Sequence, residues 1–467
     1  MKTKKILSFL LASIIAAGGL TGCNNSKNAS VTKDGKIVLT VGNSADKDAN
    51  PEAYAKFMET KARFEEKYPD IEVTPDTWSY DVQTFAAKAE GGTLPIIYNT
   101  HFTEAKKIID LGYSADITDA MKQYGYYDVV SDELMNEISR DGKVYLIPSS
   151  VYTLGLVMNL NLFREAGLMN ADGSPKFPQT FDEVRSMAKT IHDKTGKAGF
   201  VFPTTQNAGG WNFTDLAWNF GGTFMKESGD KWESDFNDGT TAALQWLKDM
   251  MWEDGSLPAT TLISNDDTAK LVGTDQAAMM LAHPAQVDIL VGSYGLDRKN
   301  IGYAKMPAGP AKHTTLMGGG YYVIAPQATP EQIDAAFKWL EFGGNVPATT
   351  LTDDAKASLR ADYETKYKEN KTVIGIKDLS IWTDKEATQG YKNELIEEFR
   401  NIDEKNISSY NDKSGVEYQT EEKMCAQDLY GLLDACIQEV LTNKDADCGE
   451  ALKKAASDFQ SNFLNNI

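Results

Sequence analysis

The stretch Gly142-Lys143-Val144-Tyr145-Leu146-Ile147-Pro148, continued by residues 151–159, decides how this chain is organised. Residues 151–159 form an apolar run that predicts a strand. Pro178-Gln179-Thr180-Phe181-Asp182-Glu183 then opens a helix, because Thr180 and Glu183 form a capping box and apolar residues recur at helical spacing after them. A strand followed by such a helix indicates a βα unit.

The N-terminal third of the chain shows the same alternation. Short apolar runs predict strands at residues 37–41, 71–73 and 94–98. Asn50-Pro51 predicts a helix start, since asparagine is a good cap and proline suits the first turn. We therefore expect an α/β fold with a mostly parallel sheet. Ligands of such sheets bind at the carboxyl ends of the strands, which points to the loops at 42–49 and 99–103.

The first residues have the pattern of an export signal. The basic segment Met1-Lys2-Thr3-Lys4-Lys5 precedes an uncharged run that ends in Leu20-Thr21-Gly22-Cys23. This order is typical of a lipoprotein signal peptide at residues 1–22, with Cys23 as the lipidated N-terminus of the mature chain. Residues 23–36 are polar and are expected to form a flexible tether. We therefore expect the body outside the cytoplasm, anchored to the cell membrane by lipid.

Charge and hydropathy exclude several kinds of partner. Without residues 1–22 the chain has 44 basic and 67 acidic residues, a net charge of −23. Such a surface repels nucleic acid and anionic lipid. No later segment is long and apolar enough to predict a membrane span. Of the cysteines, Cys425, Cys436 and Cys448 are expected as free thiols, with a Cys436–Cys448 bridge left open.

Motifs of common enzymes and metal sites are absent from the sequence. It contains no Gly-x-Ser-x-Gly, no His-Glu-x-x-His and no phosphate-binding Gly-x-x-x-x-Gly-Lys-Ser/Thr motif. The histidines at 101, 192, 283 and 313 are scattered, and Pro51 spoils the calcium-loop pattern that begins at Asp46. We expect no metal and no cofactor. Because carboxylates abound, the acid pair of a glycoside hydrolase stays open.

Further segments follow residues 142–148 in a fixed order. They are Met158-Asn159-Leu160-Asn161-Leu162-Phe163-Arg164-Glu165-Ala166-Gly167-Leu168, Ala277-Ala278-Met279-Met280-Leu281, Met306-Pro307-Ala308-Gly309-Pro310, Gly318-Gly319-Gly320-Tyr321 and Ala335-Ala336-Phe337-Lys338-Trp339-Leu340. This ordered set, joined to the lipoprotein signal, resembles the bacterial extracellular solute-binding proteins of ABC importers, in the sugar-binding family that includes maltose-binding protein. The likeness covers nearly the whole mature chain.

The resemblance implies two α/β lobes joined by a hinge, with a ligand cleft between them. The first lobe would comprise 37–150 and 311–347, and the second lobe 151–310 and 348–467. The chain would cross near Ser149-Ser150-Val151, near Ala311 and near Pro347. Closure of the lobes on the ligand would be the signal that an ABC permease reads.

Four residues of the second lobe are candidate ligand contacts. Aromatic faces cover the apolar faces of sugar rings, and polar side chains pair with the hydroxyl groups. Trp211, beside the flexible pair Gly209-Gly210, is the leading stacking residue, with a structural tryptophan as the alternative. By resemblance, Tyr152 and Trp382 supply further rings. At His283-Pro284-Ala285 many family members have Gly-Pro-Trp, so His283 is a polar contact or a structural residue. The missing tryptophan argues against inferring a maltodextrin-like specificity from the resemblance alone.

Further candidates lie in the first lobe and at the hinge. They are Asn43 and Ser44 after the first strand, Asn99 and His101 after the third, which is expected to end at Tyr98, and Gly320 and Tyr321 in the glycine-rich turn. Each has a structural alternative as a cap, turn or strand residue. Together these observations predict a monomeric, anchored binding protein that delivers a carbohydrate, expected to be an oligosaccharide, to an ABC permease. A receptor that feeds a sensor kinase and an anchored carbohydrate-active enzyme are the alternatives.

Overall fold

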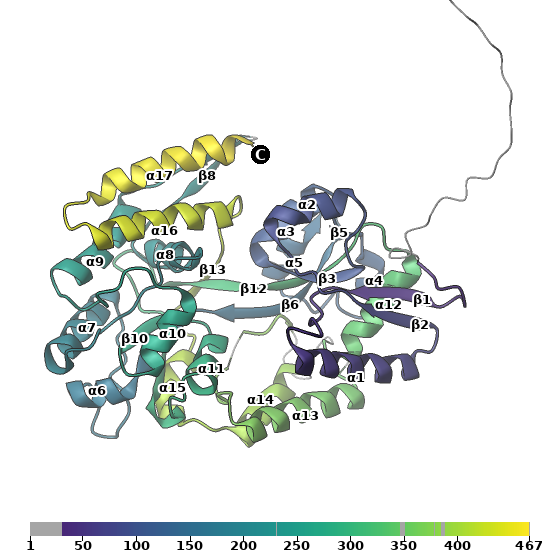
Figure 1. Ribbon diagram of the computed structural model, residues 1–467, viewed down its shortest axis with the longest axis horizontal. Helices are drawn as coiled ribbons and strands as arrows, with labels where there is room; N and C mark the ends of the chain where they lie inside the picture. The colour runs from purple at the N-terminus through teal and green to yellow at the C-terminus, as the bar shows by residue number, and fades with distance from the viewer. Residues whose placement is uncertain (1–29, 230, 346–350, 378, 384–387, 467) are drawn as a thin grey trace, which may run out of the picture.

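The computed structural model describes residues 30–229, 231–345, 351–377, 379–383 and 388–466. It has two lobes, with strands β6 (Leu146–Thr153) and β12 (Thr314–Ile324) running between them (Figure 1). Within the described ranges, every helix is too short or too polar to cross a membrane. The signal peptide and Cys23 lie outside these ranges.

The first lobe is built on a mixed sheet with the strand order β13, β12, β3, β1, β2, and β6 also pairs with β12. Strands β1 (Ile37–Val41), β2 (Ile71–Pro75) and β3 (Ile97–His101) are parallel, as the sequence predicts. Strand β12 runs antiparallel to β3 and β6, and β13 (Glu417–Thr420) runs parallel to β12. His101 pairs with Gly320, so the carboxyl end of β3 lies beside the hinge.

Helices cover the first-lobe sheet. Helix α1 (Pro51–Lys67) begins where the sequence predicts, and the Asn50 side chain accepts the N–H of Ala53 at 3.1 Å. It packs on α12 (Pro330–Phe342) through contacts of Phe64 with Trp339 and Phe342. The remaining elements of this lobe are α2 (Val82–Glu90), the 3-10 turn η1 (Phe102–Glu104), α3 (Ala105–Asp110), α4 (Thr118–Gln123), α5 (Asp132–Ile138), β4 (Ser139–Arg140) and β5 (Lys143–Val144).

The second lobe has a three-stranded sheet in the order β10 (Met279–Ala282), β7 (Gly155–Asn159), β11 (Ile301–Lys305). Both outer strands run antiparallel to β7, so the expectation of a mostly parallel sheet is wrong for this lobe. Its helices are α6 (Leu160–Ala166), α7 (Phe181–Thr195), α8 (Ala208–Asn219), α9 (Asp238–Trp252), α10 (Asn265–Gly273), α11 (Pro284–Gly292), α15 (Glu404–Asn411), α16 (Ala426–Thr442) and α17 (Cys448–Asn462). Thr180 caps α7 as predicted, accepting the N–H of Glu183 at 3.2 Å.

The two crossing strands pass from one apolar core to the other. On β6, Val151 is buried in the first-lobe core, whereas Leu154, just after the strand, is buried in the second-lobe core. On β12, Leu316 belongs to the second-lobe core and Met317 to the first. The run at 151–159, expected as one strand, therefore breaks at Leu154, where the chain changes sheets.

The C-terminal segment also crosses between the lobes. Helices α13 (Asp353–Glu369) and α14 (Thr388–Phe399) lie along the lower side of the molecule in Figure 1. Val373 is buried in the second lobe, but Ile381 and Trp382 are buried in the first-lobe core. The expectation that 348–467 completes the second lobe is therefore wrong for these two residues. Pro347, the expected third crossing, lies outside the described residues.

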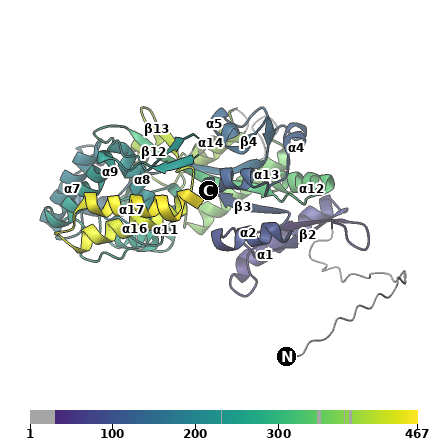
Figure 2. The same cartoon turned by 90° about the horizontal axis from the view of Figure 1, so that it is seen from above.

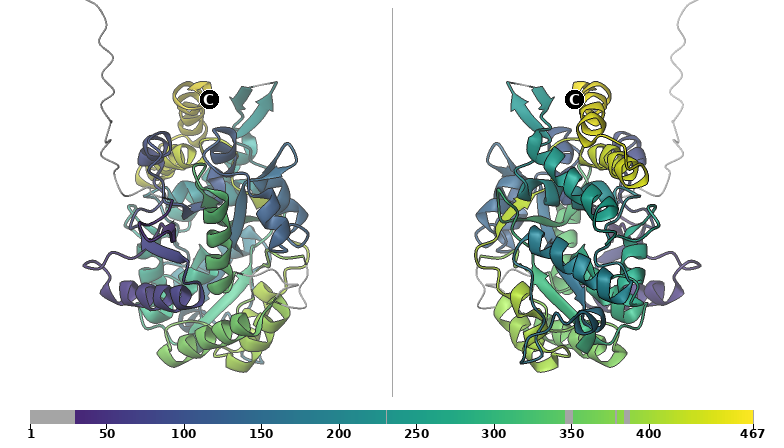
Figure 3. Two further views of the ribbon diagram at one scale, coloured as in Figure 1. Left: turned by 90° about the vertical axis from the view of Figure 1, so that its right-hand side faces the viewer. Right: turned by 90° about the vertical axis from the view of Figure 1, so that its left-hand side faces the viewer.

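Helices α16 and α17 lie over the second lobe (Figure 2). The hairpin of β8 (Met225–Ser228) and β9 (Lys231–Ser234) projects from the same lobe (Figure 3). Cys425, Cys436 and Cys448 are free thiols.

Candidate ligand-binding site

Three ring side chains from separate elements of the second lobe lie in a row. The ring centroids of Tyr152 on β6 and His283 before α11 are 4.8 Å apart, and those of His283 and Trp211 on α8 are 6.2 Å apart. All three residues are partly exposed. The sequence predicts each of them as a separate contact, and the structure brings them together. Because sugar rings stack on aromatic faces, this row is a candidate binding platform.

Trp211 is held by the close approach of two helices. A Cβ on Gly210 would lie 2.2 Å from the carbonyl oxygen of Tyr430 on α16, which no side chain permits. The Asp434 carboxylate accepts the N–H groups of Gly210 and Asn207, both at 2.7 Å. The sequence suggests that the Gly209-Gly210 pair is flexible, but the structure shows that its role is to let α8 pack closely on α16.

Two adjacent glutamates hold two tryptophans of α8. Glu421, just after β13, accepts hydrogen bonds from the Trp211 indole and, at 3.2 Å, from the Tyr430 hydroxyl. Glu422 accepts the indole N–H of Trp218 at 3.1 Å. Burial raises the pKa of each carboxyl to about 7. Trp218 lies in the second-lobe core, whereas Trp211 belongs to the ring row, and both glutamates line the cavity between the lobes.

The imidazole of His283 is positioned by the start of α11. The backbone N–H of His283 donates to Oε1 of Gln286 at 3.2 Å, and Pro284 occupies the first turn. Burial lowers the pKa of the imidazole to about 4, so the ring is neutral near pH 7. A neutral imidazole has one donor and one acceptor nitrogen, which suits a sugar hydroxyl.

The first lobe contributes a carboxylate of its own. Glu104 is buried, and its carboxylate accepts hydrogen bonds from the hydroxyls of Tyr80 and, at 3.2 Å, Thr103. The exposed ring of His101 lies edge-on to Tyr80, with centroids 6.3 Å apart. Burial is the main cause of the raised pKa of Glu421, and the charge of Glu104 adds to it. The two lobes thus present carboxylates to each other.

Three first-lobe candidates have structural partners. Asn43 has a left-handed backbone with φ of 58°, and its side chain accepts the N–H of Asn99 at 2.8 Å. The buried Ser44 hydroxyl donates to the carbonyl of Val41 at 2.8 Å. The Asn99 side chain hydrogen-bonds to Tyr322. These contacts tie the ends of β1 and β3 together, which favours the structural alternative for Asn43 and Ser44.

The glycine-rich part of β12 packs closely against Tyr152 and its neighbours on β6. A Cβ on Gly318 would lie 2.7 Å from the Tyr152 ring, so the ring lies flat against this glycine. A Cβ on Gly319 would lie 2.2 Å from the Ser150 carbonyl oxygen. Gly320 is partly exposed, but Tyr321 is buried and stacks on Phe102 with centroids 4.4 Å apart.

Trp382 lies away from the ring row. It is 4% exposed and packs in the first-lobe core, where its ring meets Tyr126 with centroids 5.5 Å apart. A bridge between Trp382 and Val130 fixes it there. The expectation that Trp382 supplies a stacking ring from the second lobe is corrected by this packing.

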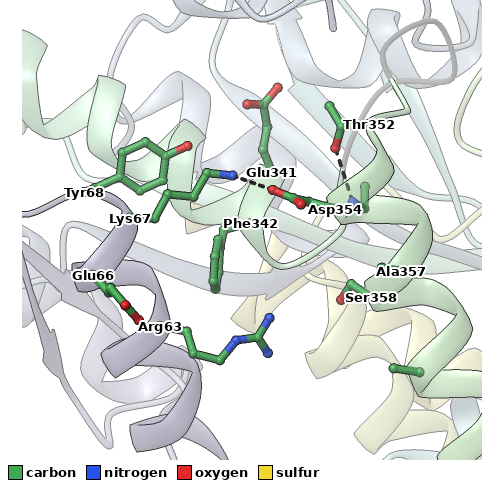
Figure 4. Close-up of a pocket in the computed structure, with 12 residues that line it drawn as sticks. Arg63, Glu66, Lys67, Tyr68, Glu341, Phe342, Thr352, Asp354, Ala357 and Ser358 are labelled. Carbon is green, nitrogen blue, oxygen red and sulfur yellow. Dashed lines mark hydrogen bonds and ion pairs between the residues drawn. The ribbon is translucent and has the colours of Figure 1, made fainter.

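Two cavities lie elsewhere in the molecule, and the ring row lines neither of them. One of about 270 Å³ lies between the lobes, lined by Phe102 and Arg140 of the first lobe and Glu227 and Glu421 of the second. Figure 4 shows another, of about 620 Å³, between α1, the end of α12 and α13. An ion pair of Lys67 with Asp354, at 2.9 Å, borders that cavity, and no residue of the ring row lines it.

The described residues include no cluster of histidine, cysteine, aspartate and glutamate side chains that could hold a metal ion. Sequence reasoning missed Glu104, Tyr80 and Glu421 as members of the site. Glu421 could have been found only from its position beside the predicted cleft. That position becomes known only once the register of β13 on β12 is known.

The model of the bacterial extracellular solute-binding proteins matches residues 48–350. The chain belongs to this family. As an extracellular solute-binding protein it is a binding protein and not an enzyme, and the resemblance stated from the sequence is confirmed.

Individual relatives agree with the two-lobed fold. The solute-binding protein is 24% identical over 415 residues to the maltodextrin-binding protein MdxE of Bacillus subtilis (strain 168), covering 82% of this chain and 91% of the relative. Its fold is similar to the GacH receptor of Streptomyces glaucescens GLA.O, solved unliganded and with acarbose, with a TM-score of 0.64, 18% identity and coverage of 91% and 97%. It is also similar to maltose-bound MalE3 of T. maritima, with a TM-score of 0.62, 18% identity and coverage of 91% and 99%.

Proposed function

We propose that this solute-binding protein captures an oligosaccharide between its lobes and delivers it to an ABC permease. The observation that carries the proposal is the row of Tyr152, His283 and Trp211, three partly exposed rings brought together from β6, the start of α11 and α8. A row of rings suits a ligand with several sugar rings, since each ring offers an apolar face.

The polar groups around the row support the same ligand class. Glu421 and the neutral imidazole of His283 supply acceptors, and Glu104 adds a carboxylate from the opposite lobe. Hydroxyl groups pair with such acceptors. That MdxE and MalE3 bind maltodextrin and maltose makes α-linked glucans the first ligands to test.

Lobe closure is the proposed transport signal. Strands β6 and β12 connect the two cores through short stretches, so rotation there would bring Glu104 toward Trp211. The ligand shifts the population toward the closed form only if it contacts both lobes.

Anchoring through a lipid on Cys23 is the second part of the proposal. It rests on Leu20-Thr21-Gly22-Cys23 after an uncharged run. Mass spectrometry of the mature protein from membranes tests it. An N-terminal Cys23 with a diacylglycerol mass is expected, and cleavage elsewhere without lipid would refute anchoring.

A thermal-shift screen of residues 24–467 tests the ligand class. The panel contains monosaccharides, α-linked maltooligosaccharides, and β-linked cello- and chito-oligosaccharides, followed by product analysis of every hit. A ligand that binds only the folded state raises the unfolding temperature, so stabilisation by one sugar class without turnover is expected. Absence of any shift would reject a carbohydrate ligand.

A further inference from the structure

Glu421 lies close to the hinge strands and to the ring row. Thr420, the last residue of β13, pairs with Met317 of β12, so Glu421 follows at the level of Gly318. Gly318 pairs in turn with Tyr152 of β6. The Glu421 carboxylate therefore lies just after β13, at the level of Gly318 on β12 and Tyr152 on β6, and it also interacts with Trp211.

The Glu421 carboxylate can accept more hydrogen bonds than its protein partners donate. A carboxylate accepts about four hydrogen bonds. The Tyr430 hydroxyl and the Trp211 indole are the partners that the structure gives it among the described residues, and both belong to the second lobe. Glu421 also lines the 270 Å³ cavity between the lobes, where its remaining acceptor positions can meet a ligand.

Carboxylates outnumber cations around that cavity. Lys106, Arg140 and Lys423 line it, and Lys106 and Arg140 share the carboxylate of Asp110, at 2.8 Å and 2.7 Å. The lining carboxylates are Glu137, Glu227, Glu421 and Glu422. Glu104, from the first lobe, acts electrostatically on Glu421 with the same sign. An anionic ligand that enters this cavity would therefore meet net repulsion from carboxylates.

We propose that Glu421 orients the Trp211 indole and selects uncharged or amine-bearing sugars over anionic ones. This specificity role rests on the proposed carbohydrate function, whereas the orienting role is a property of the unliganded protein. The neighbouring Glu422, which holds Trp218 in the core, provides a matched control.

The first test follows the indole N–H resonances of ¹⁵N-labelled protein between about pH 5 and pH 9, with Trp211 assigned by Trp211→Phe. Burial raises the pKa of Glu421 to about 7, so the Trp211 resonance should titrate near that pH. Tyr430 on α16, Tyr321 on β12 and Glu104 of the first lobe interact with Glu421. The other charged groups that line the cavity with it are Lys106, Glu137, Arg140, Glu227, Glu422 and Lys423. Those tyrosines have raised pKa values and stay protonated in this range.

Glu421→Gln should abolish the titration of the Trp211 resonance while keeping an acceptor for the indole. Glu422→Gln should leave Trp211 titrating and abolish the titration of Trp218. A Trp211 resonance that titrates unchanged in Glu421→Gln would overturn the orienting role. If Glu421→Gln does not fold, the wild-type resonance decides, because a Trp211 signal independent of pH also overturns it.

The second test compares maltotriose with maltotrionate, its aldonic acid, by calorimetry. Wild type should prefer maltotriose, and Glu421→Gln should narrow the preference by about tenfold. If wild type and Glu421→Gln prefer maltotriose over maltotrionate by the same factor, Glu421 does not select ligands by charge. If wild type binds neither sugar, the proposed function fails for α-glucans, and the resonance titration alone decides the role of Glu421.

Discussion

The imidazole of His283 lies over the phenol ring of Tyr152, with centroids 4.8 Å apart and an angle of 32° between the planes. His283 follows β10 and Tyr152 is part of the hinge strand β6, so the contact links the second-lobe sheet to the crossing.

Replacing His283 separates its packing from its polarity. His283→Ala should weaken sugar binding by about 1 kcal/mol or more, because Tyr152 and Trp211 lose the ring between them. His283→Phe should retain the packing and lose only the hydrogen-bonding nitrogens, so its affinity should lie between the other two. Calorimetric titration measures all three proteins. Wild-type affinity in His283→Ala would show that the ring lies outside the binding site.

Alanine substitutions at the adjacent hinge glycines Gly318 and Gly319 should differ in their effects on stability and sugar binding. Gly318→Ala places a methyl group against the Tyr152 ring, which can turn aside, so the protein should fold but bind its sugar more weakly. Gly319→Ala places a methyl group 2.2 Å from the Ser150 carbonyl oxygen, which is backbone and cannot move without breaking the β6–β12 pairing. The Gly319→Ala substitution should therefore lower the unfolding temperature markedly, whereas Gly318→Ala should lower it little. Thermal unfolding and titration of both variants check this pair, and equal stability would contradict it.

Asp215 predicts a specific pH dependence of stability. This residue of α8 is 0% exposed, and burial raises the pKa of its carboxyl to about 8, so the folded state keeps a proton that the unfolded state loses. Its contribution is therefore present at low pH and is lost as pH rises toward 8, by about 1.4 kcal/mol per pH unit.

In Asp215→Asn this slope should vanish. The difference in free energy of unfolding between wild type and Asp215→Asn, measured with urea at about pH 5, 6 and 7, should change in favour of the variant as pH rises. Parallel pH profiles of the two proteins would contradict a protonated Asp215.

Cys425 should report lobe closure. Glu104 and Lys107 of the first lobe act electrostatically on its thiol, and burial raises the pKa to about 11, so alkylation is expected to be slow. Bound sugar should slow it further by bringing the lobes together. Cys436 and Cys448 are 5% and 3% exposed and should react only after unfolding. Iodoacetamide labelling followed by mass spectrometry, with Cys425→Ser as control, measures this. A rate at Cys425 unaffected by the sugar would argue against closure.

Much of the fold is predictable because its signals are local. Asn50-Pro51 and the capping box of Thr180 with Glu183 mark helix starts through contacts within one turn. The expectation of a strand at 94–98 is wrong at both ends, because β3 spans Ile97–His101 and so contains Asn99 and His101, which the sequence places in the following loop. Just before the ladder begins, Thr40 accepts the N–H of Ile96 at 2.7 Å. That contact joins residues far apart in sequence.

The site was only partly predictable for the same reason. Tyr152, His283 and Trp211 stood out as residue types in suggestive places. Glu421 did not, because it is one of 67 acidic residues, and its role depends on how β13 registers on β12. Trp382 was misplaced because its burial against Tyr126 comes from a return of the chain to the first lobe, which no local pattern indicates.

A calorimetric titration of residues 24–467 with the sugar that gives the largest thermal shift tests the central claim most directly. Wild type and Trp382→Phe, whose altered ring lies in the first-lobe core, should bind the sugar with equal affinity. Trp211→Ala should unfold at the same temperature but bind at least ~1 kcal/mol more weakly. Unchanged affinity in Trp211→Ala would contradict the assignment of the ring row as the binding site.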